Sequence, residues 1–425
     1  TSSPGQRILK LLQDSAGPAG DAHDRLDPAV ARLGGDRSLE LAGPVRKEVD
    51  RGYGQLAPLA AGLGLYHQAA QLLPAALGAG APQTYLVLLP NPTELRPAGG
   101  YMGAVGQLTF AGGNPTVKVV DQYSLNGHYR DVFPIPSTIG RYLRFDRNSF
   151  EIGDSGWDPD FPASAQLAQK MYASAKDTPT EGAVSIDPYA IQSLLAVTGP
   201  VDVPVYGSFD STNFLSKLNV IVNVDTSTTG GKAALGPVSQ AVFAQLLAAP
   251  PGRWADLAKA LQESVRQRHI QVYADQPQLE QLARAAGVSG ALPAPNDAVD
   301  FLMKVDANVG ATKGDFFAQK SLQVKVERYP EGIVRHEVIA TYQMPNPANP
   351  TDETLNPGDY RDYLRFYLPE TATVHALNIY FDGKVTDLNY LDSLTLEGGH
   401  RVAAAALTLP RGHTAEVHLY YEVPM

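Results

Sequence analysis

The apolar run TYLVLLP leads directly into three polar residues, Asn91, Glu94 and Arg96, and then into the paired glycines Gly99 and Gly100. A loop that only turns the chain needs Gly, Pro or Asn, and not a carboxylate beside a guanidinium. Glycine at such a point lets a ligand come close to the backbone. The loop is therefore a candidate site, although Glu94 and Arg96 could also form an exposed ion pair that contributes about 0–1 kcal/mol.

Two further segments place carboxylates near expected strand ends. Asp121 closes the run TVKVVD, where a charge costs free energy unless it is partnered. Asp154 and Asp160 lie with Trp157 in the stretch EIGDSGWDPDFPASA. Each has a structural alternative: a turn residue for Asp154, a helix cap for Asp160, and a lid over the core for Trp157 instead of a platform for a sugar. Because ligands bind outside the carboxyl ends of strands in open α/β sheets, we expect the strand-end groups to share one edge.

Paired carboxyl groups suit the cleavage or transfer of glycosidic bonds, since one protonates the leaving oxygen and the other acts as nucleophile or base. We expect Glu94 and Asp154 to fill these roles, with Asp121 and Asp160 as substitutes. Arg96 would hold one carboxylate in its ionised form. The residues expected to contact the substrate are Asn91, Arg96, Gly99, Gly100, Tyr101, Tyr123, Trp157 and Arg130. This chemistry calls for no metal ion and no cofactor.

The elements that must position these residues change along the chain. Residues 7–77 carry apolar side chains at helical spacing with Pro and Gly interruptions, which predicts a helical stalk over 1–80. Strands alternate with helices over 81–317, which predicts a layered α/β domain with a mainly parallel core and a helical insertion over about 208–300. Short alternating runs over 318–425 predict an antiparallel β-sandwich. The predicted fold class is an α/β core with helical additions and a C-terminal β-sandwich.

The segment VDANVGATKGD gathers Asp306, Asn308, Lys313 and Asp315 around two glycines. Two interpretations are open. The segment could fold back to close the cleft of the α/β domain, or it could simply connect that domain to the sandwich.

Composition excludes several classes of protein. The net charge of −10 comes with no block of five like charges, which argues against a nucleic-acid partner. The chain has no cysteine, so disulfides and thiolate chemistry are excluded. The nine histidines are scattered and form no pair with metal-ligand spacing. The chain starts with Thr, and we expect an N-terminal membrane segment to precede it and to anchor the protein at the outside of the cell.

Four motifs, in order, resemble an uncharacterised family of bacterial extracellular proteins that carry one N-terminal membrane helix: NPTELRPAGGYMG, DSGWDPDFPASA, VSIDPYAIQSLLAVTGPVDV and VDANVGATKGD. The resemblance covers roughly residues 80–330. Within it, the central portion is similar to the LytR-CpsA-Psr fold, whose members attach glycopolymers to cell walls. Where that fold has a metal-binding Asp and an Arg after the first strand, this sequence has Asn91, Glu94 and Arg96. Where the fold has an Arg-Asp pair after the third strand, this sequence has Asp121, Gln122 and Tyr123, and its Arg130-Asp131 pair lies further downstream.

Three functions are therefore open. The first is a carbohydrate-active enzyme, a glycoside hydrolase or transglycosylase, acting on a cell-envelope polysaccharide. The high Gly, Pro and Ala content resembles that of actinobacterial proteins, which suggests arabinan or arabinogalactan as the substrate. The second, implied by the resemblance, is a phosphotransferase that uses Mg²⁺ and a lipid-pyrophosphate donor held by Arg96, Arg130 and Arg141 or Arg144. The third is an envelope module that binds glycan without catalysis.

Overall fold

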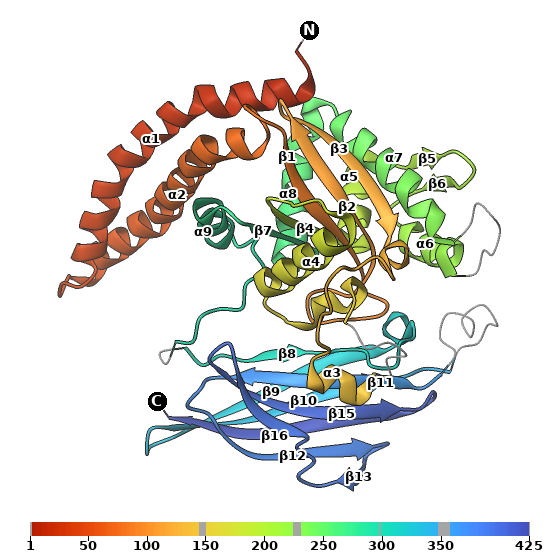
Figure 1. Ribbon diagram of the computed structural model, residues 1–425. Coiled ribbons are helices and arrows are strands. Elements are labelled where there is room, and N and C mark those ends of the chain that lie inside the picture. The colour runs from red at the N-terminus through yellow and green to blue at the C-terminus, as the bar shows by residue number, and fades with distance from the viewer. Residues whose placement is uncertain (1, 144–149, 224–230, 297–298, 347–357, 425) are drawn as a thin grey trace.

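The protein begins with two long helices that form a hairpin projecting from the body (Figure 1). The structure is a computed structural model that describes residues 2–143, 150–223, 231–296, 299–346 and 358–424. Helix α1 spans Pro4–Asp36 and α2 spans Gly43–Ala76. In the described part of the chain, no helix combines the length and apolar character needed to cross a membrane.

The hairpin is more regular than the sequence suggests. Both helices run through their internal prolines, so the expected interrupted stalk is a pair of continuous helices. Glycine makes their close approach feasible, because a Cβ atom at Gly20 would lie 2.7 Å from the His67 ring. His67 Nδ1 in turn lies 2.6 Å from the Ala16 carbonyl oxygen. The two helices therefore pack closely although both contain internal prolines.

The body contains a five-stranded sheet in the order β3-β2-β1-β4-β7. Its strands are β1 Gln83–Asn91, β2 Tyr101–Ala111, β3 Asn114–Asp121, β4 Gly182–Ile186 and β7 Ile270–Ala274. The prediction of a mainly parallel core was wrong: β1 pairs with β4 in parallel, whereas β1–β2, β2–β3 and β4–β7 are antiparallel. The β1–β2 and β2–β3 connections are shorter than the dozen or so residues that a parallel crossover requires.

Helices cover both faces of this sheet, as expected for a layered α/β domain. Helix α4 (Phe161–Lys176) packs on the face that presents Leu86 and Leu88. Helices α5 (Pro188–Thr198) and α7 (Leu235–Leu247) lie against the other face. This explains why Tyr85, Leu86, Val87 and Leu88 in the TYLVLL run are buried. The remaining helices are α3 Ser137–Tyr142, α6 Phe214–Asn223, α8 Trp254–Arg266 and α9 Pro277–Ala285.

Two local features depart from the expected pattern of elements. The stretch HIQVYA lies within the helical insertion expected over about 208–300, but α8 ends before it and Arg268 adopts a φ of 62°. The next residues form β7, the edge strand beside β4. The stretch PVDVPVYG forms two strands, because β5 (Val201–Val203) turns back and pairs with β6 (Gly207–Phe209) in a separate two-stranded sheet.

The C-terminal part is an antiparallel β-sandwich, as predicted. Its two sheets have the orders β13-β12-β16-β10-β9 and β14-β15-β11-β8. Their strands are β8 Met303–Val305, β9 Gln319–Tyr329, β10 Ile333–Gln343, β11 Tyr360–Leu368, β12 Thr373–Phe381, β13 Lys384–Asp387, β14 Ser393–Glu397, β15 His400–Leu409 and β16 Thr414–Pro424. Leu364, Leu377 and Leu419 are completely buried between them. The sandwich was expected to begin at residue 318, but it also includes β8, which lies before that residue and pairs with β11.

Candidate functional site

The loop after β1 is buried, and Arg96 is its centre. Arg96 is 1% exposed and Glu94 is 8% exposed, so they do not form a surface pair. Arg96 Nε donates to Asp154 Oδ1 at 2.7 Å, and Nη2 donates to Glu94 Oε1 at 3.2 Å. Nη1 donates to the carbonyl oxygens of Leu95 and Asn308 at 3.1 and 2.8 Å. One guanidinium therefore joins the two carboxylates expected to be catalytic.

This arrangement changes the interpretation of the carboxylate pair. Burial alone would lower the pKa of Arg96, but the charges of Asp154 and Glu94 outweigh it and raise that pKa. Burial raises the pKa of Asp154 above its usual value, although Arg96 opposes the shift. A glycosidase places its two carboxyl groups on either side of the scissile bond. Here the guanidinium fills the space between Glu94 and Asp154 that such a bond would need.

An apolar cavity of about 330 Å³ opens beside this loop. Its walls are mostly aliphatic side chains of α5, α6 and α7, among them Ile191, Leu215, Leu218, Val238 and Val242. The loops at the ends of β1 and β3 and the segment 305–315 contribute polar lining residues, and we call this end of the cavity the cavity mouth: Asn91, Glu94, Tyr101, Tyr123 and Lys313. The volume lies at the lower end of the range of about 300–1,000 Å³ for small-molecule sites. An apolar interior with a polar mouth matches an amphiphilic ligand.

Lys313, which is far from Glu94 in the sequence, places a positive charge at the cavity mouth. Its Nζ donates to Glu94 Oε2 at 3.1 Å, and the neighbouring Ala311 also lines the cavity. The segment 305–315 therefore folds back over the α/β edge, which is one of the two alternatives open from the sequence. The polar residues around two glycines in the sequence marked this segment as a possible part of the site, but they did not identify Lys313 as the residue that reaches the cavity.

A second close polar contact, between Asp187 and His269, lies where β4 ends, on the same edge. Asp187 Oδ1 accepts hydrogen bonds from the backbone N–H groups of Tyr189 and Ala190, which caps α5. Its Oδ2 lies 2.6 Å from Nδ1 of His269. Asp187 is part of the cavity wall. Sequence reasoning missed this pair because His269 is 82 residues away and precedes a strand that was expected to be helix.

The other two expected catalytic carboxylates have structural contacts. Asp121 pairs with Ala104 across the sheet, at the same end of β2 as the Asn91 pairing, so both lie on the expected edge. Its carboxylate accepts from Tyr123 N at 3.0 Å and caps the short helix η1 (Gln122–Leu125). Asp160 Oδ1 accepts from Leu292 N at 2.7 Å. Asp160 stands at the N-cap position of α4, but its side chain makes no capping hydrogen bond there. Neither of these contacts involves Glu94.

Trp157 and Arg130 also lie apart from the mouth. Trp157 is 6% exposed and stacks on Tyr363 with 6.1 Å between ring centroids, so most of its indole ring is packed in the core. Arg130 donates to the Ala173 carbonyl and pairs with Asp177 at the C-terminus of α4.

The paired glycines and the tyrosines at the mouth have separate roles. A Cβ at Gly100, where φ is 145°, would lie 2.3 Å from the Asn91 carbonyl oxygen, so the glycine serves a close backbone approach within the loop. Gly99, with φ 115°, also needs glycine for its conformation. The Tyr101 hydroxyl accepts a hydrogen bond from Gln122 Nε2 at 2.6 Å, and burial raises the pKa of Tyr101 above its usual value. Tyr123 is 48% exposed at the mouth.

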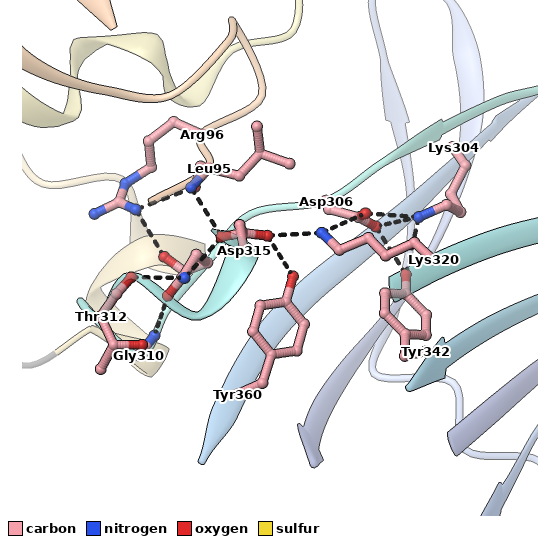
Figure 2. Close-up of polar contacts among 11 residues, drawn as sticks. Leu95, Arg96, Lys304, Asp306, Gly310, Thr312, Asp315, Lys320, Tyr342 and Tyr360 are labelled. Atoms are coloured by element: carbon pink, nitrogen blue, oxygen red, sulfur yellow. Dashed lines mark hydrogen bonds and ion pairs between the residues drawn. The ribbon is translucent and has the colours of Figure 1, made fainter. Parts of the chain in front are cut away.

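A chain of polar contacts connects the loop to the sandwich (Figure 2). Asp315 Oδ2 accepts from Leu95 N at 3.0 Å, and its Oδ1 accepts from Lys320 Nζ at 2.7 Å and from the Tyr360 hydroxyl at 2.9 Å. Lys320 in turn pairs with Asp306 at 3.1 Å. The sandwich therefore fixes both the loop after β1 and the segment that carries Lys313.

The residues at the mouth do not fit a bound Mg²⁺ ion. Such an ion is usually held by one or two carboxylates together with substrate phosphates. Glu94 is already flanked by Arg96 and Lys313. Within the described ranges, no group of three or more Asp, Glu or His side chains is placed to hold a metal. Of the other arginines expected at a pyrophosphate, Arg141 pairs with Asp392 at 3.1 Å, and Arg144 lies outside the described residues.

Comparison with known proteins finds a family match for the central part of the chain. Residues 80–221 match the family described as "Protein of unknown function (DUF4012)". The resemblance to an uncharacterised family is confirmed over these residues. No curated protein matches the chain.

Similar solved structures include a transcriptional regulator from Enterococcus faecalis (11% identity, 50% of this chain and 74% of that chain, TM-score 0.31). They also include TagV from Bacillus subtilis (13% identity, 49% and 80%, TM-score 0.28). A third is a LytR-Csp2A-Psr enzyme from Actinomyces oris (16% identity, 48% and 75%, TM-score 0.27). Because these TM-scores are below 0.5, the description of the fold given above rests on the strand order itself.

Proposed function

We propose that the protein binds a lipid-linked glycan of the bacterial envelope, with the lipid chain in the cavity and the polar head group at the cavity mouth. The division of the cavity carries this proposal. Aliphatic side chains of α5, α6 and α7 line its interior, and the polar groups of the strand-end loops gather at its mouth. Each methylene of a lipid chain that leaves water for such a site contributes about 0.8 kcal/mol.

The head group would meet Lys313, which is directed to the mouth by its contact with Glu94. A lysine ammonium is a common ligand of phosphate. The hydroxyl of Tyr123 and the amide of Asn91 add groups that can bond a sugar or a phosphate oxygen. A prenyl phosphate or pyrophosphate bearing a glycan combines the two parts that the cavity accommodates. An envelope location follows from this ligand class and from the resemblance.

Transfer of the glycan is a second candidate, favoured by the LytR-CpsA-Psr resemblance together with the cation at the mouth. In that reaction an acceptor hydroxyl oxygen bonds to the phosphorus next to the sugar. The bond from that phosphorus to the bridging oxygen breaks, the lipid phosphate leaves, and the acceptor proton passes to Glu94 or to water. Cleavage of a glycosidic bond by Glu94 and Asp154 has less support, because Arg96 lies between them.

The test is direct binding of a prenyl phosphate, measured by native mass spectrometry and by a thermal shift. Leu218→Trp adds bulk to the cavity wall and should abolish binding while the protein stays folded. Leu322→Trp, at an exposed position on β9, is the matched control and should bind normally. Equal binding by both variants, or no binding by the unmodified protein, would refute the proposal. Release of prenyl phosphate from a prenyl-pyrophosphate glycan in the presence of an acceptor would support the transfer reaction.

A further inference from the structure

A second hollow, of about 800 Å³, lies between the α/β part and the sandwich and is distinct from the cavity. We call it the interdomain hollow. Its polar and aromatic lining comes from the loop before α4, from β11 and from the end of β14: Trp157, Asp158, Asp160, Arg365, Tyr367 and Glu397. Both parts of the protein contribute, so the hollow exists only when the sandwich is docked. Ligand sites occur preferentially at such domain interfaces.

Arg365 forms the polar floor of this hollow. Arg365 is 4% exposed. Its Nη1 donates to Glu397 Oε2 at 2.8 Å, and its Nη2 donates to the Trp157 carbonyl oxygen at 3.0 Å. Its Nε–H has no hydrogen-bond partner among the described residues. Buried donors are rarely left unpaired, because the lost hydrogen bond is costly. A small shift of the lining side chains would expose this buried N–H group to an acceptor oxygen in the hollow.

The charges around the floor select the kind of ligand. Asp158, Asp160 and Glu397 line the hollow with Arg365 and Arg284, so carboxylates outnumber guanidinium groups. Arg365 pairs with Glu397, and Arg284 pairs with Glu280 at 2.8 Å. A phosphate or carboxylate ligand would meet more negative than positive charge. A neutral ligand with hydroxyl groups could donate to the carboxylates and accept from the Arg365 Nε–H.

The rest of the lining suits the carbon face of a sugar. Phe150, Trp157 and Leu167 give the hollow an apolar wall beside the polar floor. A sugar presents both hydroxyl groups and C–H groups, so it can contact the polar floor and the apolar wall at the same time. We propose that the interdomain hollow binds a neutral carbohydrate chain. Only the choice of envelope glycans as probes rests on the proposed function, because the hollow is separate from the lipid cavity.

The two tryptophans of the chain allow a direct test. Trp254 is 46% exposed on α8, so Trp254→Phe leaves Trp157 in the hollow as the single fluorescent tryptophan. This protein is titrated with neutral arabino-, galacto- and manno-oligosaccharides, and with oligogalacturonate as the anionic comparison. We expect a saturable change in Trp157 emission with at least one neutral oligosaccharide and none with oligogalacturonate. Isothermal titration on the unmodified protein should give the same affinity.

Asp158→Asn then locates the binding site. Asp158 is exposed and Asn keeps the oxygen that accepts from Asp160 N, so the fold should persist. Loss of a hydrogen bond to a charged group should weaken sugar binding about tenfold or more. Asp202→Asn, at an exposed position on β5, should leave it unchanged. The inference is overturned if no neutral oligosaccharide binds, if oligogalacturonate binds as well as they do, or if the two variants bind alike. If the same protein binds prenyl phosphate but no neutral oligosaccharide, the inference about the hollow fails while the proposed lipid cavity stands.

Discussion

Replacing Arg96 with Met should destabilise the protein strongly, because one guanidinium satisfies four groups at once. The methionine side chain has a similar length but cannot pair with Asp154 or Glu94, and it leaves the Asn308 carbonyl without its donor. Removing one partner of a buried ion pair typically costs about 3–5 kcal/mol. We expect about 3 kcal/mol, since burial already raises the pKa of Asp154 and the variant can protonate it. For a domain of this size, that corresponds to a fall in Tm of about 6–12 °C.

The assay is thermal unfolding at several pH values. The deficit of Arg96→Met should shrink as the pH falls, because Asp154 becomes protonated and no longer needs a cation. Arg130→Met is the matched control: its pair with Asp177 has side-chain exposures of 60% and 84%, so its Tm should change by about 2 °C or less. An Arg96→Met protein as stable as this control would refute the structural role assigned to Arg96.

Three other outcomes follow from the described contacts. Burial and the charge of Asp306 raise the pKa of Asp362 well above its usual value, so the folded state holds a proton that the unfolded chain releases as pH rises above about 4. Asp362→Asn should therefore raise the Tm at pH 8 more than at pH 4, and an equal change at both would contradict this. Lys313→Gln should weaken prenyl phosphate binding about tenfold or more but leave prenyl alcohol binding unchanged; equal losses would exclude a phosphate contact. Gly100→Ala should lower stability by about 1–3 kcal/mol, measured by urea unfolding, because its Cβ meets the Asn91 carbonyl; no change would show that the loop can relax.

Sequence patterns predicted the elements whose signals are local. The apolar TYLVLL run forms a strand that is covered on both faces, and the short alternating runs of the C-terminal part form the sandwich. The direction of strand pairing was not local. Short connections require antiparallel pairing for β1–β2 and β2–β3, but not for β4–β7. The sequence pattern of buried strands is the same for parallel and antiparallel neighbours in a covered sheet.

The site was harder to predict because its contacts join distant residues. Glu94 and Arg96 were identified from the sequence, but the partners that define their role lie far along the chain: Asp154 is 58 residues from Arg96, and Lys313 is 219 residues from Glu94. Unless these distant partners are known, the sequence cannot distinguish a buried structural arginine from a catalytic one. The cavity walls were missed for a different reason. Leu218 and Val238 belong to helices whose apolar residues serve packing and lining equally well.

The most direct measurement of the central claim is photo-crosslinking with a prenyl phosphate that carries a diazirine near the end of its chain. Peptide mapping should find the adducts on α6 (Phe214–Asn223) and α7 (Leu235–Leu247), which line the cavity, and Leu218→Trp should remove them. The structure offers a clear competing location, an apolar groove of about 510 Å³ between α2 and α9. Adducts in that groove, or adducts on α6 and α7 that persist in Leu218→Trp, would contradict the account.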